Sequence, residues 1–228
     1  MPFLQVTGGV EQNVNEPWVA LSHCWGPNGT VSLITTEETL PERIAGIEME
    51  SLPKSFQDAV TITRKLGFRY LWIDSLCILQ DDKEDWKTES GKMNQIYSQA
   101  ALVIAVEAAE SSEDGIFDST SVMRNQDLIV VRYTWPSAGV TDGTLWLKPR
   151  GKTEETAQVW LSSEGPLSSR AWTLQENFLA PRILKYGDSQ IKWSCRSFQY
   201  TEKKCESPIR TRSCESFVPT WRNLRLPS

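Results

Sequence analysis

The chain has 228 residues, of which 39% are hydrophobic and 23% charged, and its formal net charge at pH 7 is −5. These values are ordinary for a globular protein with one sizeable core, and the acidic balance excludes the basic surface that nucleic-acid binding requires. No apolar run approaches the roughly 20 residues that cross a bilayer, so we expect no membrane partner and a cytoplasmic location.

The N-terminus and the cysteines also favour an intracellular protein. The opening residues lack the basic start and apolar run of a signal peptide. The cysteines include no close C-x-x-C pair, so we expect reduced thiols rather than a disulfide framework or a thiolate metal site. They are Cys24, Cys77, Cys195, Cys205 and Cys214.

The first half of the chain alternates apolar segments with amphipathic ones. Apolar runs bounded by Pro, Gly or polar turns predict strands, and apolar residues spaced three and four apart predict helices. This alternation is typical of βαβ units, so we predict an α/β protein with a mostly parallel sheet covered by helices on both faces. The predicted elements are a strand at 18–22, a strand near 31–34, a short helix at 37–44, a helix within 52–67, a strand at 70–78, a helix at 84–99 and a strand at 101–106.

The second half of the chain contains more antiparallel features. Two strand-like pieces, at 127–133 and 144–149, flank a turn-rich connection and predict a β-hairpin insertion. Ser168 is a candidate N-cap for a short helix that ends at residue 176. Two final strands, at 182–187 and 190–195, are predicted to form an antiparallel pair.

No Pro-, Gly- or Ser-rich linker divides the chain, and we find no internal repeat. We therefore predict a single domain over residues 1–200. Residues 201–228 are expected to form a peripheral C-terminal extension, which is consistent with truncation of a longer protein.

Polar side chains follow three predicted strands at the points where those strands end. "SHCWG" (22–26) follows the first strand, "DSLC" (74–77) follows "YLWI", and Glu107 follows the strand at 101–106. Because the carboxyl ends of parallel strands share one edge of a sheet, where doubly wound folds bind ligands, we expect these groups to lie together. An equally supported interpretation is that Ser22 and Asp74 only bond backbone amides at strand ends.

The sequence excludes several common chemistries. Its single histidine, His23, adjoins Cys24, and neighbours in an extended segment point to opposite faces, so the two cannot act as base and nucleophile. No second histidine serves a catalytic triad or a zinc site, and neither G-x-G-x-x-G nor a P-loop is present. What remains is carboxylate chemistry without a metal, from Asp74, Asp81, Glu89, Glu107 or Glu176.

Three segments, in order, resemble the blocks of the fungal heterokaryon incompatibility (HET) domain. They are "WVALSHCWG" within 18–34, "FRYLWIDSLCILQDDKEDW" and its continuation within 68–106, and "SSRAWTLQENFLAPRILKYGDSQIKWSC" over 168–195. Members of that family trigger regulated cell death when genetically different fungal cells fuse. The resemblance therefore implies a death-inducing domain of fungal allorecognition and innate immunity, controlled by an upstream sensor domain or protein.

The HET family in turn resembles, distantly, the Toll/interleukin-1 receptor (TIR) fold. This resemblance implies a flavodoxin-like, mostly parallel sheet with flanking helices, to which the hairpin and the C-terminal strand pair are additions. "ALSHCWG" is similar to the first strand and loop of that fold, with Cys24 and Trp25 in place of its aromatic–Arg pair. "DWKTE" is similar to the helix that carries a Trp and a catalytic Glu, here Trp86 and Glu89.

The TIR resemblance also implies hydrolysis of the nicotinamide–ribose bond of NAD, with NAD or a related nucleotide as substrate and no bound cofactor. Such a reaction needs a fixed carboxylate in a dry site rather than a nucleophilic histidine. Glu89 would be that carboxylate, and Asp74, the second catalytic candidate, would orient the ribose or brace the loop. The candidate substrate-binding residues are Ser22, His23, Cys24, Trp25, Gly26, Ser75, Cys77, Trp86, Arg170 and Glu176.

Several alternatives stay open at this point. The domain would be a non-enzymatic module that self-assembles and recruits a death effector, or a nucleotide-binding regulator without turnover. Arg170 would grip a phosphate or pair with Asp74 or Glu176. In every version that follows the TIR pattern, we expect a homo-oligomer on activation.

Overall fold

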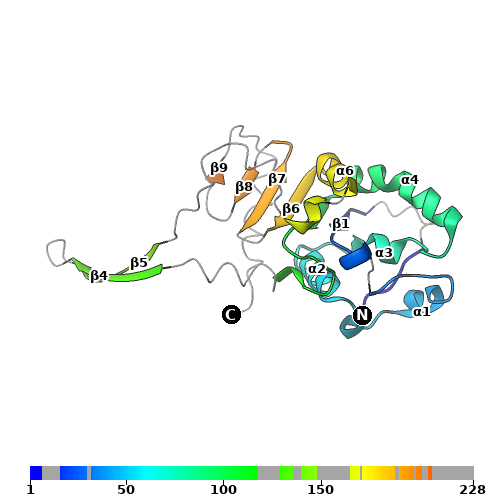
Figure 1. Cartoon of the computed structure of the whole chain (residues 1–228), viewed down its shortest axis with the longest axis horizontal. Coiled ribbons are helices and arrows are strands. Elements are labelled where there is room, and N and C mark those ends of the chain that lie inside the picture. The colour runs from blue at the N-terminus through cyan, green and yellow to red at the C-terminus, as the bar shows by residue number, and fades with distance from the viewer. Residues whose placement is uncertain are drawn as a thin grey trace.

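The centre of the protein is a mixed seven-stranded sheet. The computed structural model describes residues 1–6, 16–29, 32–117, 129–135, 140–147, 165–169, 171–187, 190–197, 199–201 and 205–206. The strand order is β2-β1-β3-β6-β7-β8-β9. Figure 1 shows the succession of β6, β7, β8 and β9. Four parallel strands lie side by side: β2 (Tyr70–Trp72), β1 (Trp18–Ser22), β3 (Leu102–Val106) and β6 (Arg182–Tyr186). Three antiparallel strands extend the sheet: β7 (Ile191–Cys195), β8 (Gln199–Thr201) and β9 (Cys205–Glu206).

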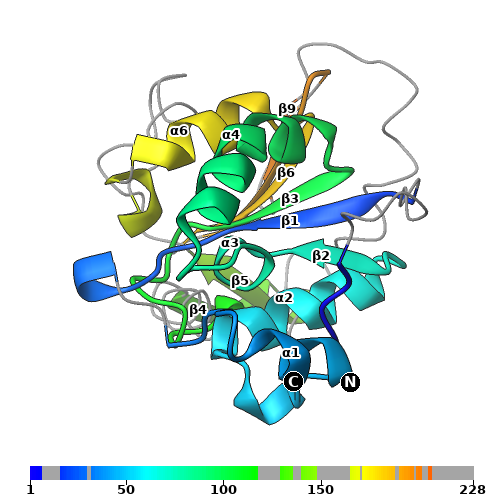
Figure 2. The same ribbon diagram turned by 90° about the vertical axis from the view of Figure 1, so that its right-hand side faces the viewer.

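Helices cover both faces of the parallel strands, which confirms the predicted α/β class. α1 (Leu40–Ala45) and α2 (Lys54–Lys65) lie on one face, whereas α4 (Lys83–Gln99) and α6 (Ala171–Leu179) contact each other on the opposite face (Figure 2). Short helical turns join these elements: η1 (Pro27–Gly29), η2 (Met49–Ser51), α3 (Asp74–Cys77) and η5 (Pro166–Ser169). Within the described ranges, none of the helices has the length and apolar character to cross a membrane.

The predicted hairpin insertion between β3 and α6 is also confirmed. β4 (Ile129–Trp135) and β5 (Val140–Leu147) pair antiparallel in a two-stranded sheet of their own. The register shifts between Tyr133 and Trp135, which marks a bulge or irregularity in the ladder. The hairpin therefore contributes no strand to the seven-stranded sheet.

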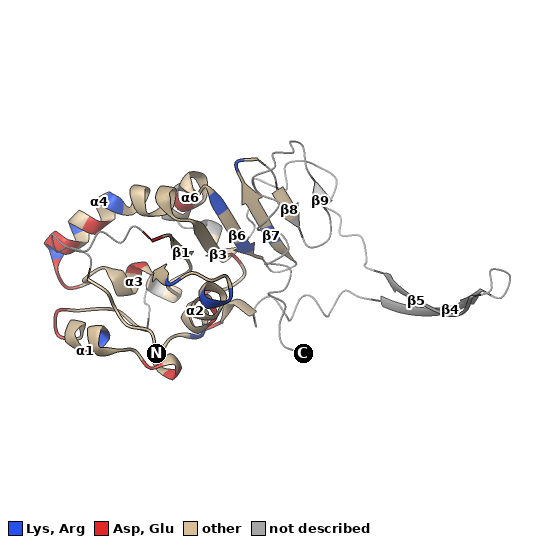
Figure 3. Ribbon diagram, turned by 180° about the vertical axis from the view of Figure 1, so that it is seen from behind, with Lys and Arg blue, Asp and Glu red and all other residues tan. Residues whose placement is uncertain are grey.

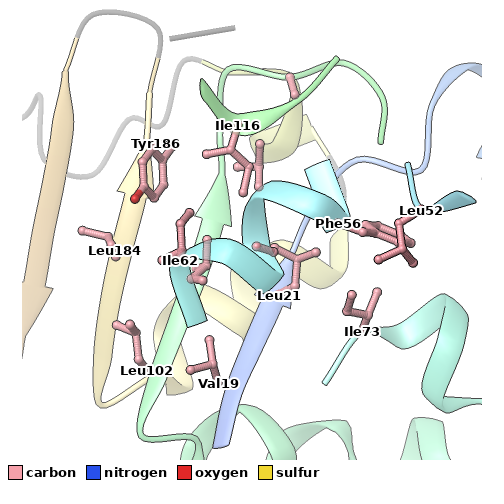
Figure 4. Packing of buried hydrophobic residues seen from close by; sticks show 14 of the residues in the cluster. Val19, Leu21, Leu52, Phe56, Ile62, Ile73, Leu102, Ile116, Leu184 and Tyr186 are labelled. Carbon is pink, nitrogen blue, oxygen red and sulfur yellow. The ribbon is translucent and has the colours of Figure 1, made fainter. Parts of the chain in front are cut away.

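Alternation along β1 sorts the core into two layers. Val19 and Leu21 belong to a large apolar cluster that includes Phe56 of α2 (Figure 4). Ala20, one position away, belongs to a smaller cluster with Tyr97 of α4. Successive side chains of a strand point to opposite faces, so a continuous apolar run supplies both layers.

The acidic residues around the start of α4 (Figure 3) mainly cap and brace the backbone. The carboxylate of Asp82 accepts hydrogen bonds from the N–H groups of Glu84 and Asp85, at 2.8 and 3.3 Å. Such bonds satisfy donors that have no partner within the first turn of a helix. Asp81, one of the candidate carboxylates, accepts from the Glu37 N–H at 3.1 Å and so holds the segment before α1.

The strand predicted at 70–78 is wrong in its second half, because β2 ends at Trp72. The carbonyl of Ile73 accepts hydrogen bonds from the N–H groups of Leu76 and Cys77, at 3.1 and 2.8 Å, and this closes the α3 turn. The polar residues after β2 are therefore presented by a helical turn rather than by an extended segment.

Two other predicted elements near the N-terminus differ from the structure. The strand near 31–34 is absent from the described residues 32–34, and only Thr35 makes an isolated bridge, to Leu79. The helix predicted from residue 37 begins at Leu40, because the Thr36 N–H donates to the hydroxyl of Thr39 and forms a turn first.

The C-terminal third agrees with the prediction in the order α6, β6 and β7, and the structure adds the strands β8 and β9, which were not predicted. α6 begins at Ala171 and continues to Leu179, while Ser168 lies within the preceding η5 turn and not at the helix N-cap. The antiparallel pair β6–β7 is confirmed. The division of the chain at residue 200 stays a prediction, and residues 207–228 lie outside the described part.

Candidate functional site

The candidate site lies at the carboxyl edge of β1, β2 and β3. After β1 the chain forms β2 on one side of β1, and it then crosses to form β3 on the other side. A topological switch point therefore lies between β1 and β3. In open α/β sheets, ligands bind at such a point, outside the carboxyl ends of the strands. Ser22 ends β1, Asp74 follows β2 and Glu107 follows β3. Because these strands are parallel, the three polar residues fall on one edge, as predicted.

Ser22 and Glu176 join the first and third sequence blocks. The hydroxyl of Ser22 donates to Oε2 of Glu176 across 154 residues of sequence. Both side chains are buried, and Glu176 comes from α6. The contact brings two predicted site residues together and ties α6 to the end of β1.

Asp74 braces the loop after β1 against the α3 turn. Its Oδ2 accepts a hydrogen bond from the indole N–H of Trp25 at 2.8 Å, and its Oδ1 accepts from the backbone N–H of Ser75 at 2.7 Å. Nδ1 of the buried His23 lies 3.9 Å from Oδ1. Both carboxylate oxygens are therefore engaged by neighbouring segments of the chain.

His23 and Cys24 point to opposite sides of the sheet. The imidazole of His23 meets Phe56 of α2 edge-on, with ring centroids 4.9 Å apart. Cys24 packs in the cluster that contains Tyr97 of α4. A base and its nucleophile need direct contact, so this arrangement agrees with the exclusion of a Cys–His pair.

Cys77 is a poor candidate for a nucleophile. Part of the residue reaches the surface, yet the pKa of its thiol is raised to about 12, chiefly by burial. The carboxylates of Asp74 and Glu89 add to this increase, while the N–H of Ile73, 3.5 Å from Sγ, acts in the opposite direction. The thiolate is the reactive form, so the structure favours a packing role for this residue.

Glu89 and Trp86 lie in the first two turns of α4. Oε1 of Glu89 accepts a hydrogen bond from Nζ of Lys92 at 2.7 Å, and 23% of the Glu89 side chain is exposed. Trp86 is 49% exposed. Asp74 and Glu89, the two carboxylates proposed as catalytic, both contribute to the raised pKa of the Cys77 thiol.

Lys185 is a residue of this edge that the sequence analysis did not predict. It lies on β6 in register with Ala105 of β3, which in turn pairs with Ser22. Its Nζ lies 3.2 Å from Oε1 of Glu107, and Glu107 is only 4% exposed. The available signal was "RILKY", where a lysine interrupts an otherwise apolar strand segment just before its end.

The remaining candidates are Arg170, Gly26 and Ser75. Arg170 lies outside the described residues, so its pairing with Asp74 or Glu176 stays a prediction. Gly26 has a φ of 113°, a left-handed conformation that glycine adopts without strain, and serves the turn into η1. Ser75 is buried, and its hydroxyl makes no hydrogen bond. Among the described residues, no group of three or more His, Cys, Asp or Glu side chains is placed to hold a metal ion.

Comparison with known proteins points to one family. The family profile described as Heterokaryon incompatibility protein (HET) matches residues 18–176. Heterokaryon incompatibility protein 6, OR allele, of Neurospora crassa is 31% identical over 93 residues, which cover 38% of this chain and 14% of that protein. No solved structure matches the chain significantly.

Proposed function

Because the chain belongs to the heterokaryon incompatibility (HET) family, we propose that it is a death-inducing domain of fungal heterokaryon incompatibility. The Neurospora protein that it resembles is named for that process. In this role the domain acts in the cytoplasm, under an upstream sensor domain or protein, and assembles with copies of itself on activation. The family match extends over the ends of β1, β2 and β3 and reaches Glu176 of α6, so it includes the candidate site.

The proposed chemistry is hydrolysis of the nicotinamide–ribose bond of NAD. The C–N bond breaks, its electron pair leaves on the nicotinamide, and a water oxygen bonds to the ribose carbon and releases a proton. The products are ADP-ribose, nicotinamide and one proton. Because the leaving group already carries positive charge, the protein has to stabilise an oxocarbenium-like centre and place the water.

The observation that carries this proposal is that Ser22, Asp74 and Glu107 lie at the carboxyl edge of the parallel strands, with Glu89 on α4, the helix that follows the α3 turn. The strand order 2-1-3 is the order of flavodoxin-like sheets, which supports the TIR resemblance. Both oxygens of Asp74 are bonded to the loop and turn, so we assign it the bracing role. Glu89 is assigned the catalytic carboxylate, positioned by Lys92.

Loss of NAD in a purified sample tests this proposal directly. We expect wild-type protein to consume NAD, increasingly so at high protein concentration, and Glu89→Gln to lose at least about a hundredfold of that rate. Glu84→Gln, an exposed position on the same helix, is the matched control and should keep the rate. If Glu89 only interacts with the helix dipole, the Glu89→Gln variant should fold and hydrolyse NAD at the wild-type rate. Its free energy of unfolding should then fall by about 0.3–1 kcal/mol.

The second candidate function is a non-enzymatic module that self-assembles and recruits a death effector. It is favoured by Phe178 of α6, which is 85% exposed, and by the half-exposed Trp86 of α4, because exposed aromatic side chains often serve interfaces. Wild-type protein that kills cells but consumes no NAD, even when assembled, would support this function and defeat the hydrolase.

A further inference from the structure

Glu107 is a buried carboxylate with unused hydrogen-bonding capacity. The residue is 4% exposed, and its ion-pair partner is the ammonium group of Lys185, 3.2 Å from Oε1. That contact lacks the alignment of a hydrogen bond, and among the described residues Oε1 has no hydrogen-bond donor. An ionised carboxylate has about four acceptor sites. The acceptor sites of Oε1 therefore have no hydrogen-bond donor among the described residues, in a residue that is only 4% exposed.

The backbone of Glu107 is closely held, and two glycines lie close to this residue. The N–H of Glu107 donates to the carbonyl of Tyr186 at 2.9 Å, which locks the end of β3 to β6. A Cβ added at Gly165 would lie 2.1 Å from the Glu107 carbonyl oxygen. A Cβ added at Gly187 would lie 3.6 Å from Oε2. The backbone of Glu107 is thus held in position, and Gly187 lies beside its carboxylate.

Fold stability is a weak reason to keep this ion pair. Removing two charges from water costs more than their attraction returns unless hydrogen bonds complete their surroundings, and apolar replacements are often neutral or stabilising. The position of the pair offers another reason. Lys185 is in register with Ala105 and, through it, with Ser22, so Glu107 and Lys185 lie beside the switch point where α/β sheets bind ligands.

We propose that Glu107 binds the vicinal hydroxyl groups of a ribose, and that Lys185 is the positioning residue for its carboxylate. Two hydroxyls on neighbouring ribose carbons donate to the carboxylate, and one of them uses the acceptor sites that the described residues leave open on Oε1. The choice of ribose rests on the proposed NAD hydrolysis, in which it is the sugar attached to nicotinamide. Glu107 then holds the sugar, while Glu89 acts at the bond that breaks.

Binding of ADP-ribose and of ADP, measured by calorimetry, tests the proposal without turnover, because the two probes share the ADP part and only ADP-ribose carries the terminal ribose. We expect the wild type to bind ADP-ribose at least about tenfold more tightly than ADP, as expected for hydrogen bonds to a charged group. The variant to compare is Glu107→Gln with Lys185→Met, which removes both charges and so avoids an unpaired buried lysine. It should keep its melting temperature and bind both probes equally. Lys192→Met, in register with Lys185 on β7, is the control and should behave as the wild type.

The outcomes separate this proposal from the proposed hydrolase. A folded double variant that keeps the preference for ADP-ribose overturns the role of Glu107, and so does a wild type without any preference. If the wild type prefers ADP-ribose but hydrolyses no NAD, ribose binding stands and the hydrolase fails. If the wild type hydrolyses NAD and the double variant does so with an unchanged KM, the hydrolase stands and ribose binding fails.

Discussion

The two faces of the parallel sheet come from the same strands but carry different chemistry. The face that packs on α2 is continuously apolar, with Leu21 and Phe56 at its centre. The face that packs on α4 and α6 carries small apolar residues such as Ala20, and near the carboxyl edge it carries Ser22 and Lys185. Each strand thus serves packing with one set of side chains and the candidate site with the other. Substitutions on the first face should change stability, and those at the polar edge should change binding.

The largest effect is expected on the α2 face, from Phe56→Ala. Phe56 has no exposed surface and also contacts the ring of His23. Removing a buried phenylalanine leaves a cavity, so we expect a loss of about 3–5 kcal/mol in the free energy of unfolding, measured by chemical denaturation. Phe178→Ala, at the 85% exposed position, is the control and should change stability by less than about 0.5 kcal/mol. Equal losses in the two variants would contradict the comparison between the faces.

A smaller effect is expected from Trp25→Phe at the polar edge. This change keeps an aromatic ring but removes the N–H that bonds Asp74 Oδ2, at an expected cost of about 1–2 kcal/mol. In a double-mutant cycle with Asp74→Asn, the two losses should be non-additive by at least about 0.5 kcal/mol, because they break one interaction. Strictly additive losses would show that the indole and the carboxylate act independently in solution.

The smallest effect on function is expected from Cys77→Ala, which should retain NAD hydrolysis. The pKa of the Cys77 thiol is about 12 in the folded protein against 9.0 for an ordinary thiol. Above pH 9 the unfolded chain therefore releases this proton while the folded protein keeps it, so the thiol lowers stability as pH rises from 9 to 12. Cys77→Ala should lessen that decline in denaturation experiments. Rapid alkylation of Cys77 in the folded protein at pH 8 would argue against the buried thiol.

Much of the fold was predictable because its elements have clear local patterns. The apolar runs of β1 and β3 and the stripe of α2 that includes Phe56 indicate buried strands and a helix without reference to the rest of the chain. The segment 70–78 could not be assigned in the same way. Its polar and apolar residues suit either a strand or a turn, and the hydrogen bonds of Ile73 with Leu76 and Cys77 decide for the turn.

For the candidate site, only the segments that follow the parallel strands could be predicted from the sequence. The order of parallel strands places Ser22, Asp74 and Glu107 on one edge, and the sequence analysis identified each of them. The role of each residue could not be predicted in this way, because it depends on contacts with residues that are distant in sequence. Asp74 acquires its bracing role from Trp25, and Glu107 acquires its counter-ion from Lys185.

The sequence by itself determined most of the helices and strands, the α/β class, the family and the absence of a Cys–His pair. All of these depend on residue identity, on spacing along the chain or on alternation within one strand. Only the tertiary structure decided that Ser22 meets Glu176 and that Lys185 meets Glu107. Strand order and register bring those residues together, and both are set by packing between segments that are far apart in the chain.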